Sequence, residues 1–172
     1  RYDIKHILLY KNPVRNIASV YNSLLEFSRV SEKAFRHGFK VFYQLEEVLD
    51  LIDEYSLDCM VVSYEKLCED PEGVIKSICL KTGLPYKDNM SEFWNNHHHH
   101  NVGGNFGARS SMKDDPMDIE SPTKLHKIYR ERHKEIFVDN RYRDVFSDEQ
   151  ISRIMNDNII KDIDRRVKHA KK

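Results

Sequence analysis

The pattern that most constrains the fold occurs twice in the sequence: a short apolar run is followed directly by the start of a helix. The first run, Ile4 to Tyr10, ends at Asn12-Pro13, and the second, Cys59 to Ser63, comes shortly before Asp70-Pro71. Short, nearly continuous apolar runs are typical of strands buried in a parallel sheet. Strands that alternate with helices therefore predict an α/β fold built on a parallel sheet.

Helical spacing of apolar residues predicts the remaining elements. The expected helices run from the Asn12 cap to about Phe27, Val41 to about Ser56, Asp70 to Gly83, Thr123 to about Phe137, and Ser147 to about Lys168. Ser147 and Gln150 match a capping box. Between Ser28 and Gly38 the periodicity lapses, which predicts an exposed loop or short helix, and 87–122 is irregular. The C-terminal region is thus expected to be helical.

The composition fits one domain over residues 1–172, since 40% of the chain is hydrophobic and 33% is charged. The balance of 28 Lys and Arg against 28 Asp and Glu excludes the broad basic surface of nucleic-acid-binding proteins. The longest apolar stretches fall far below the roughly 20 residues that span a bilayer. Cys59, Cys68 and Cys79 show no paired spacing, so we expect reduced thiols and a cytoplasmic protein. The oligomeric state is left open.

The first candidate site is the turn from the first strand into its helix. A helix N-terminus offers backbone N–H groups and a positive dipole end to an anion, and Lys11 adds a full charge. Ser19 lies two turns further, on the same polar stripe as Asn12, so its hydroxyl is expected to face the same ligand. The alternative is that Lys11 is a solvated strand end and that Asn12 and Ser19 only cap and decorate the helix.

Two further segments are candidates. Tyr64 and Glu65 follow the second strand, and ligands of open parallel sheets bind beyond the carboxyl ends of the strands, so Tyr64 is a candidate to lie against a base. The alternative is that Tyr64 packs over the sheet edge and Glu65 begins a turn. In the third segment, His100 to Arg109, Gly104 and its neighbours allow close backbone approach, and Arg109 offers a guanidinium fork to a phosphate.

The four consecutive histidines, His97 to His100, do not predict a metal site. On an extended chain they point alternately to two faces, and no Cys or carboxylate stands beside them at zinc-like spacing. We expect no metal ion.

Taken in order, the three candidate segments resemble sulfotransferases, which transfer a sulfuryl group from 3'-phosphoadenosine 5'-phosphosulfate (PAPS). Lys11-Asn12-Pro13 with Ser19 is similar to the family's Arg-(Asp/Asn)-Pro motif with a Ser at that distance, and Ser63-Tyr64-Glu65-Lys66-Leu67 is similar to its Tyr-Glu-(Asp)-Leu segment. His100 to Arg109 is similar to its His-x-x-x-Gly-Asn-x-x-Arg stretch, with one extra residue before the Arg. The resemblance spans about Lys5 to Met155.

The resemblance implies a P-loop-NTPase-like sulfotransferase fold and assigns a role to each candidate residue. Lys11 and Arg109 would neutralise the 3'-phosphate, and Ser19 would donate a hydrogen bond to it. Gly104 and Asn105 would line the nucleotide, and Tyr64 would contact adenine. The acceptor would be a hydroxyl or amine of a small molecule or glycan, and the nucleotide product would be adenosine 3',5'-bisphosphate.

The family's 5'-phosphosulfate loop and its catalytic base precede the Lys11 motif, and residues 1–10 contain neither. We therefore interpret the chain as the C-terminal portion of a sulfotransferase that holds the 3'-phosphate and adenine half-site, its catalytic residues unknown. If an anchor lies upstream of Arg1, the Golgi lumen replaces the cytoplasm as the compartment. The alternatives are another P-loop-type nucleotide-dependent transferase, such as a small-molecule kinase, and a non-catalytic sulfotransferase-like binding domain.

Overall fold

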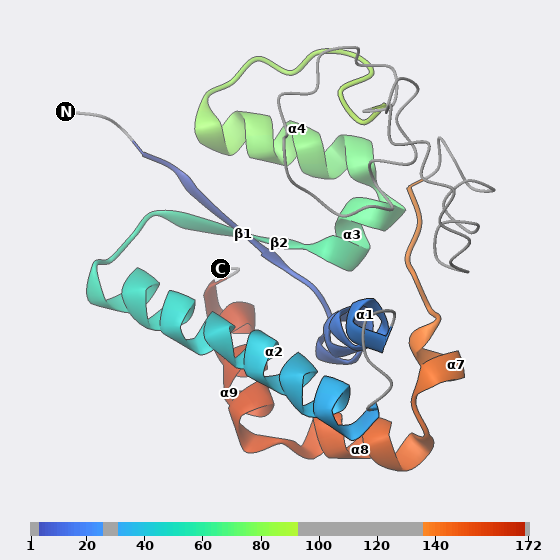
Figure 1. The fold of residues 1–172 in the computed structure, drawn as a ribbon. Helices are drawn as coiled ribbons and strands as arrows, with labels where there is room; N and C mark the ends of the chain where they lie inside the picture. Colours follow the sequence, from blue (N-terminus) through green and yellow to red (C-terminus); the bar gives the residue numbers. More distant parts are fainter. Residues whose placement is uncertain (1–3, 26–30, 93–135, 171–172) are drawn as a thin grey trace.

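The protein is rich in helix and contains a small parallel sheet. The computed structural model describes residues 4–25, 31–92 and 136–170 (Figure 1). Strand β1 (His6–Tyr10) pairs in parallel with β2 (Cys59–Ser63), with His6 opposite Cys59 and Tyr10 opposite Ser63. The predicted parallel pairing is confirmed for these two strands. None of the described helices is both long enough and apolar enough to span a bilayer.

The helices lie on both sides of the sheet. Between the strands the chain forms α1 (Pro13–Leu25) and α2 (Ser31–Glu54); after β2 it forms α3 (Tyr64–Glu69) and α4 (Pro71–Thr82). The C-terminal part forms α7 (Tyr142–Val145), α8 (Asp148–Asn156) and α9 (Asn158–Ala170). In Figure 1, α4 lies above the sheet, and α2 and α9 lie below it.

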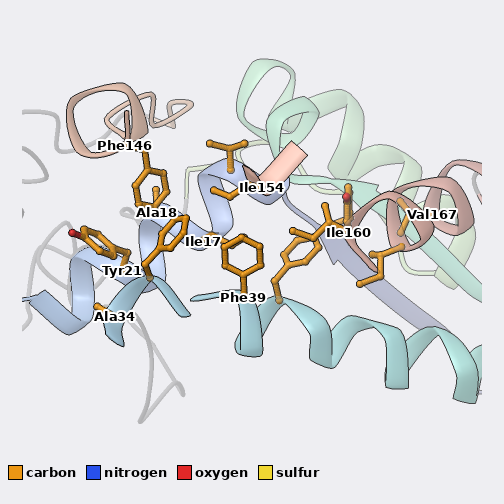
Figure 2. Packing of buried hydrophobic residues seen from close by; sticks show 14 of the residues in the cluster. Ile17, Ala18, Tyr21, Ala34, Phe39, Phe146, Ile154, Ile160 and Val167 are labelled. Carbon is orange, nitrogen blue, oxygen red and sulfur yellow. The ribbon is translucent and has the colours of Figure 1, made fainter. Parts of the chain in front are cut away.

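The main hydrophobic core lies on the α2 and α9 side of the sheet. It joins side chains from β1, α1, α2, α8 and α9, together with Phe146 (Figure 2). Phe35, Phe42, Ile17, Ile154, Ile163 and Val167 are its largest fully buried side chains. On the opposite side, Val62, Val74 and Cys79 are buried between β2 and α4 and belong to a separate, smaller group.

Over residues 31–38, the described part of the segment predicted as an exposed loop or short helix, the chain forms the first turns of the long helix α2. α2 begins at Ser31, and Ala34, Phe35 and Gly38 are buried against the core. Gly38 explains why the helix packs so closely here, since a Cβ at this position would lie 2.7 Å from Ile17 Cγ2 and 3.2 Å from the Ile17 carbonyl oxygen. The buried face depends on this contact with α1, which the local sequence pattern does not reveal.

The predicted helix from Ser147 to Lys168 is two helices. The chain becomes extended at Asp157, whose carboxylate accepts the Ile160 N–H at 3.0 Å and so caps α9. The same carboxylate accepts the Tyr43 hydroxyl of α2 at 2.8 Å. The predicted capping box of Ser147 and Gln150 is confirmed at the start of α8.

Three further predictions need correction or lie partly outside the described residues. β1 is not buried on both faces by the described residues, because Ile7 and Leu9, which alternate with the core-facing Leu8 and Tyr10, are 44% and 49% exposed. All three cysteines are free, but only Cys79 is buried. Ile136 and Phe137, at the end of the predicted 123–137 helix, are not helical, and the rest of that segment lies outside the described residues.

Candidate functional site

The site lies where the two strands end. Because Tyr10 is opposite Ser63 in the parallel register, the next residues of each strand, Lys11 and Tyr64, leave the sheet at the same edge. Lys11 Nζ lies 4.7 Å from the centroid of the Tyr64 ring, within range of a cation–π interaction. The structure therefore brings together two of the residues that the sequence singles out.

Lys11 is half-buried rather than solvated. Burial lowers the pKa of its ammonium group, while the carboxylates of Asp139 and Glu65 oppose this shift and Arg15 adds to it. Lys11 is thus less solvated than the alternative of an ordinary strand end supposes, while Asn12 caps the helix as that alternative states.

Asn12 caps α1 as predicted, but the backbone N–H groups at this helix start are not open to a ligand. The Asn12 side-chain oxygen accepts the N–H of Val14 at 3.1 Å and of Arg15 at 3.3 Å, and the Asn12 carbonyl accepts the Asn16 N–H at 2.9 Å. The Asn12 N–H donates to Glu65 Oε1 at 2.9 Å. The expectation that free N–H groups form an anion site is wrong for this arrangement, because the protein's own oxygens accept them.

Glu65 and Arg15 form an ion pair near Lys11. Arg15 Nη1 lies 3.4 Å from Glu65 Oε1, and the side chains are 21% and 18% exposed. Arg15 also donates to the side-chain oxygen of Asn140, from Nη2 at 2.8 Å and from Nε at 3.3 Å, and its guanidinium carbon lies 5.6 Å from the centroid of the Tyr142 ring. Arg15 thus joins α1 to the first turn of α3 and to the segment before α7.

Asp139 and Arg141 complete the charge cluster. Arg141 Nε donates to both Asp139 carboxylate oxygens, at 2.9 and 3.0 Å. Burial by itself would raise the pKa of Asp139. The hydrogen bonds and charge of Arg141, together with the charge of Lys11, lower this pKa by more, so the net shift is downward. Three cations, Lys11, Arg15 and Arg141, therefore lie near two carboxylates at this edge of the sheet.

Sequence reasoning missed Arg15, Asp139 and Arg141 as site residues. The only local signal is a run of polar side chains from Asp139 to Arg143 just before a capped helix. Their place beside Lys11 depends on tertiary contacts between residues about 125 apart, as between Arg15 and Asn140.

Ser19 is half-buried in α1, on the same helical stripe as Asn12 and Asn16. Its role toward a ligand stays a prediction. Gly104, Asn105 and Arg109 lie outside the described residues, as do His97 to His100. Among the residues that the structure describes, no group of three or more His, Cys, Asp or Glu side chains is arranged to hold a metal ion.

Comparison of the chain with protein-family models, with curated proteins and with solved structures finds no match.

Proposed function

We propose that the chain is the 3'-phosphate and adenine half-site of a PAPS-dependent sulfotransferase, within a fold of the P-loop-NTPase-like sulfotransferase type. The observation that carries the proposal is the contact between Lys11 and Tyr64 at the carboxyl ends of two parallel strands. Open parallel sheets bind ligands at this edge. A cation and an aromatic ring side by side match the two parts of a nucleotide, its phosphate and its base.

The charges of the cluster support an anionic ligand. Lys11, Arg15 and Arg141 carry three positive charges against the two of Glu65 and Asp139, so the cluster keeps one positive charge in a partly buried setting. A phosphate that approaches Lys11 is attracted more strongly there than at a solvated lysine, because partial burial lowers the effective dielectric constant.

Each residue of the proposal has one task. Lys11, with Arg109 and Ser19, binds the 3'-phosphate; Tyr64 packs on adenine; Gly104 and Asn105 line the nucleotide. In the complete reaction the sulfuryl group moves from the 5'-phosphosulfate to an acceptor hydroxyl or amine, which requires a base for the acceptor proton and stabilisation of the leaving phosphate oxygen. Among the described residues, we assign nucleotide binding to Lys11, Ser19 and Tyr64. We assign neither the base nor the stabilisation of the leaving oxygen to any of them.

Calorimetric titration with adenosine 3',5'-bisphosphate and with 5'-AMP tests the proposal. We expect saturable binding of the bisphosphate and at least about tenfold weaker binding of 5'-AMP, since a phosphate contact with a cation contributes about 1.5–3 kcal/mol. Lys11→Met should weaken the binding of the bisphosphate and leave the binding of 5'-AMP unchanged. Lys11→Arg should retain the binding of the bisphosphate. Lys40→Met, at an exposed lysine of α2, is the matched control.

Equal binding of the two nucleotides would refute the 3'-phosphate assignment and favour the kinase-like alternative. Binding that requires the 3'-phosphate but is unchanged by Lys11→Met would refute the role of Lys11 alone. A folded chain that binds neither nucleotide would refute the half-site.

A further inference from the structure

Glu65, in the first turn of α3 just after β2, accepts hydrogen bonds on both of its carboxylate oxygens. Oε1 accepts the Asn12 N–H at 2.9 Å and lies 3.4 Å from Arg15 Nη1. Oε2 accepts the Ser63 hydroxyl at 3.2 Å. One carboxylate oxygen thus lies between a backbone N–H and a guanidinium, which are the kinds of donor that bind phosphate oxygens in proteins.

The donors at the start of α1 fall into two classes. The N–H groups of Val14, Arg15 and Asn16 all donate to oxygens of Asn12, which belongs to the same turn, so releasing them would undo the helix cap. The Asn12 N–H and Arg15 Nη1 donate to Glu65, which comes from another element. A rotation of the Glu65 side chain would release both donors without disturbing the helix.

We infer that Glu65 is an internal counter-ion that occupies a phosphate position and must leave it when the ligand binds; the inference rests on the proposed function. A carboxylate carries one negative charge, and a terminal phosphomonoester carries about 1.5 to 2 at neutral pH. The phosphomonoester therefore competes successfully for the Asn12 N–H and Arg15. A singly charged phosphodiester or sulfate ester has no such advantage. Glu65 is thus a specificity-determining residue that selects a phosphomonoester.

Glu65→Gln tests the inference, because the amide keeps an oxygen that can accept the Asn12 N–H but lacks the charge. We expect it to bind adenosine 3',5'-bisphosphate about tenfold more tightly than the parent chain, since one like charge next to the ligand is removed. A gain in affinity cannot come from misfolding. Glu69→Gln, an exposed carboxylate one turn later on α3, is the matched control and should change affinity less than about twofold.

A second variant guards against failure of Glu65→Gln to fold. Ser63→Ala removes the hydroxyl that donates to Glu65 Oε2 and that also caps α3 by accepting the Lys66 N–H. It should tighten binding by about threefold, the smaller change expected from losing one hydrogen bond from an uncharged donor to the competitor. If neither folded variant binds more tightly than the parent chain, the inference is wrong. The proposed function still stands in that case, provided that the parent chain requires the 3'-phosphate.

A measurement without the nucleotide separates the two claims. Inorganic phosphate is titrated into the 15N-labelled parent chain and the Glu65→Gln variant, and the amide resonance of Asn12 is followed. We expect this resonance to move at a lower phosphate concentration in the variant. An Asn12 resonance that responds equally in both chains, or in neither, would overturn the inference even if adenosine 3',5'-bisphosphate binds elsewhere.

Discussion

Lys11 illustrates, at the scale of one residue, a conflict between stability and the ligand binding that we propose. Its ammonium group is half-buried, and burial lowers its pKa. Burying a charge costs free energy that a cation–π contact and nearby carboxylates only partly offset. In the proposed function, a phosphate bound to Lys11 would offset this cost.

We therefore expect Lys11→Met to leave the free energy of unfolding at pH 7 unchanged or to raise it by about 1 kcal/mol. A lowered pKa in the folded state means that the unfolded chain binds more protons between that pKa and 10.5, so the stability of the parent chain should rise relative to the variant in this window. Urea unfolding at pH 7 and at pH 10 measures both effects. Destabilisation by more than about 2 kcal/mol at pH 7 would show that Lys11 is structural.

At the scale of the elements, the contact between α1 and α2 depends on Gly38. An alanine there would gain about 1 kcal/mol in helix propensity. Its Cβ, however, would lie 2.7 Å from Ile17 Cγ2 and 3.2 Å from the Ile17 carbonyl oxygen, and the carbonyl belongs to a helix backbone that cannot move alone. The steric cost of the added methyl group should exceed the gain in helix propensity, since overpacking costs about 1–3 kcal/mol.

We expect Gly38→Ala to lower the free energy of unfolding by about 1–2 kcal/mol in urea titrations followed by circular dichroism. In an Ile17→Ala background, which removes Cγ2, the same change should cost less or become stabilising. An equal loss in both backgrounds would show that the Ile17 contact is not the cause.

At the scale of the whole molecule, the structure divides into a main core and a smaller layer. Ile17, Phe35 and Ile163 belong to the main cluster, whereas Val74 and Cys79 of α4 lie outside it. Elements with few buried apolar contacts open at lower free energy than the rest of a protein. We expect α4 to be the less stable layer.

Amide hydrogen exchange tests this division. Protection in α4 should correspond to a lower opening free energy than in α2 and α9, and Val74→Ala should reduce protection in α4 much more than in α2. Ile163→Ala, in the fully buried part of the main core, should reduce protection in α2 and α9 by about 2–5 kcal/mol. Uniform loss of protection in Val74→Ala would show that the two layers unfold together.

The sequence predicts what depends on local patterns. The parallel strands and the Asn12 and Ser147 caps follow from apolar runs and capping residues. Lys11 and Tyr64 are separate candidates in the sequence, and the register of the strands brings them together. The helix over 31–38 was not predictable, because its face is buried only by contact with α1. The same holds for the pairing of Arg15 with Asn140, since no local signal fixes a contact between residues so far apart.

The bond from the Tyr10 hydroxyl to Asp164, at 2.6 Å, joins the first strand to the last helix across 154 residues. At synthesis rates of about 5–20 residues per second, roughly 8–30 s separate the appearance of these two partners on the ribosome. During that interval the apolar side chains of α1 and α2 lack the α8 and α9 residues that cover them. The nascent chain therefore exposes apolar surface on α1 and α2. The yield of folded protein in a cell should depend on chaperones that cover this surface until α8 and α9 are made.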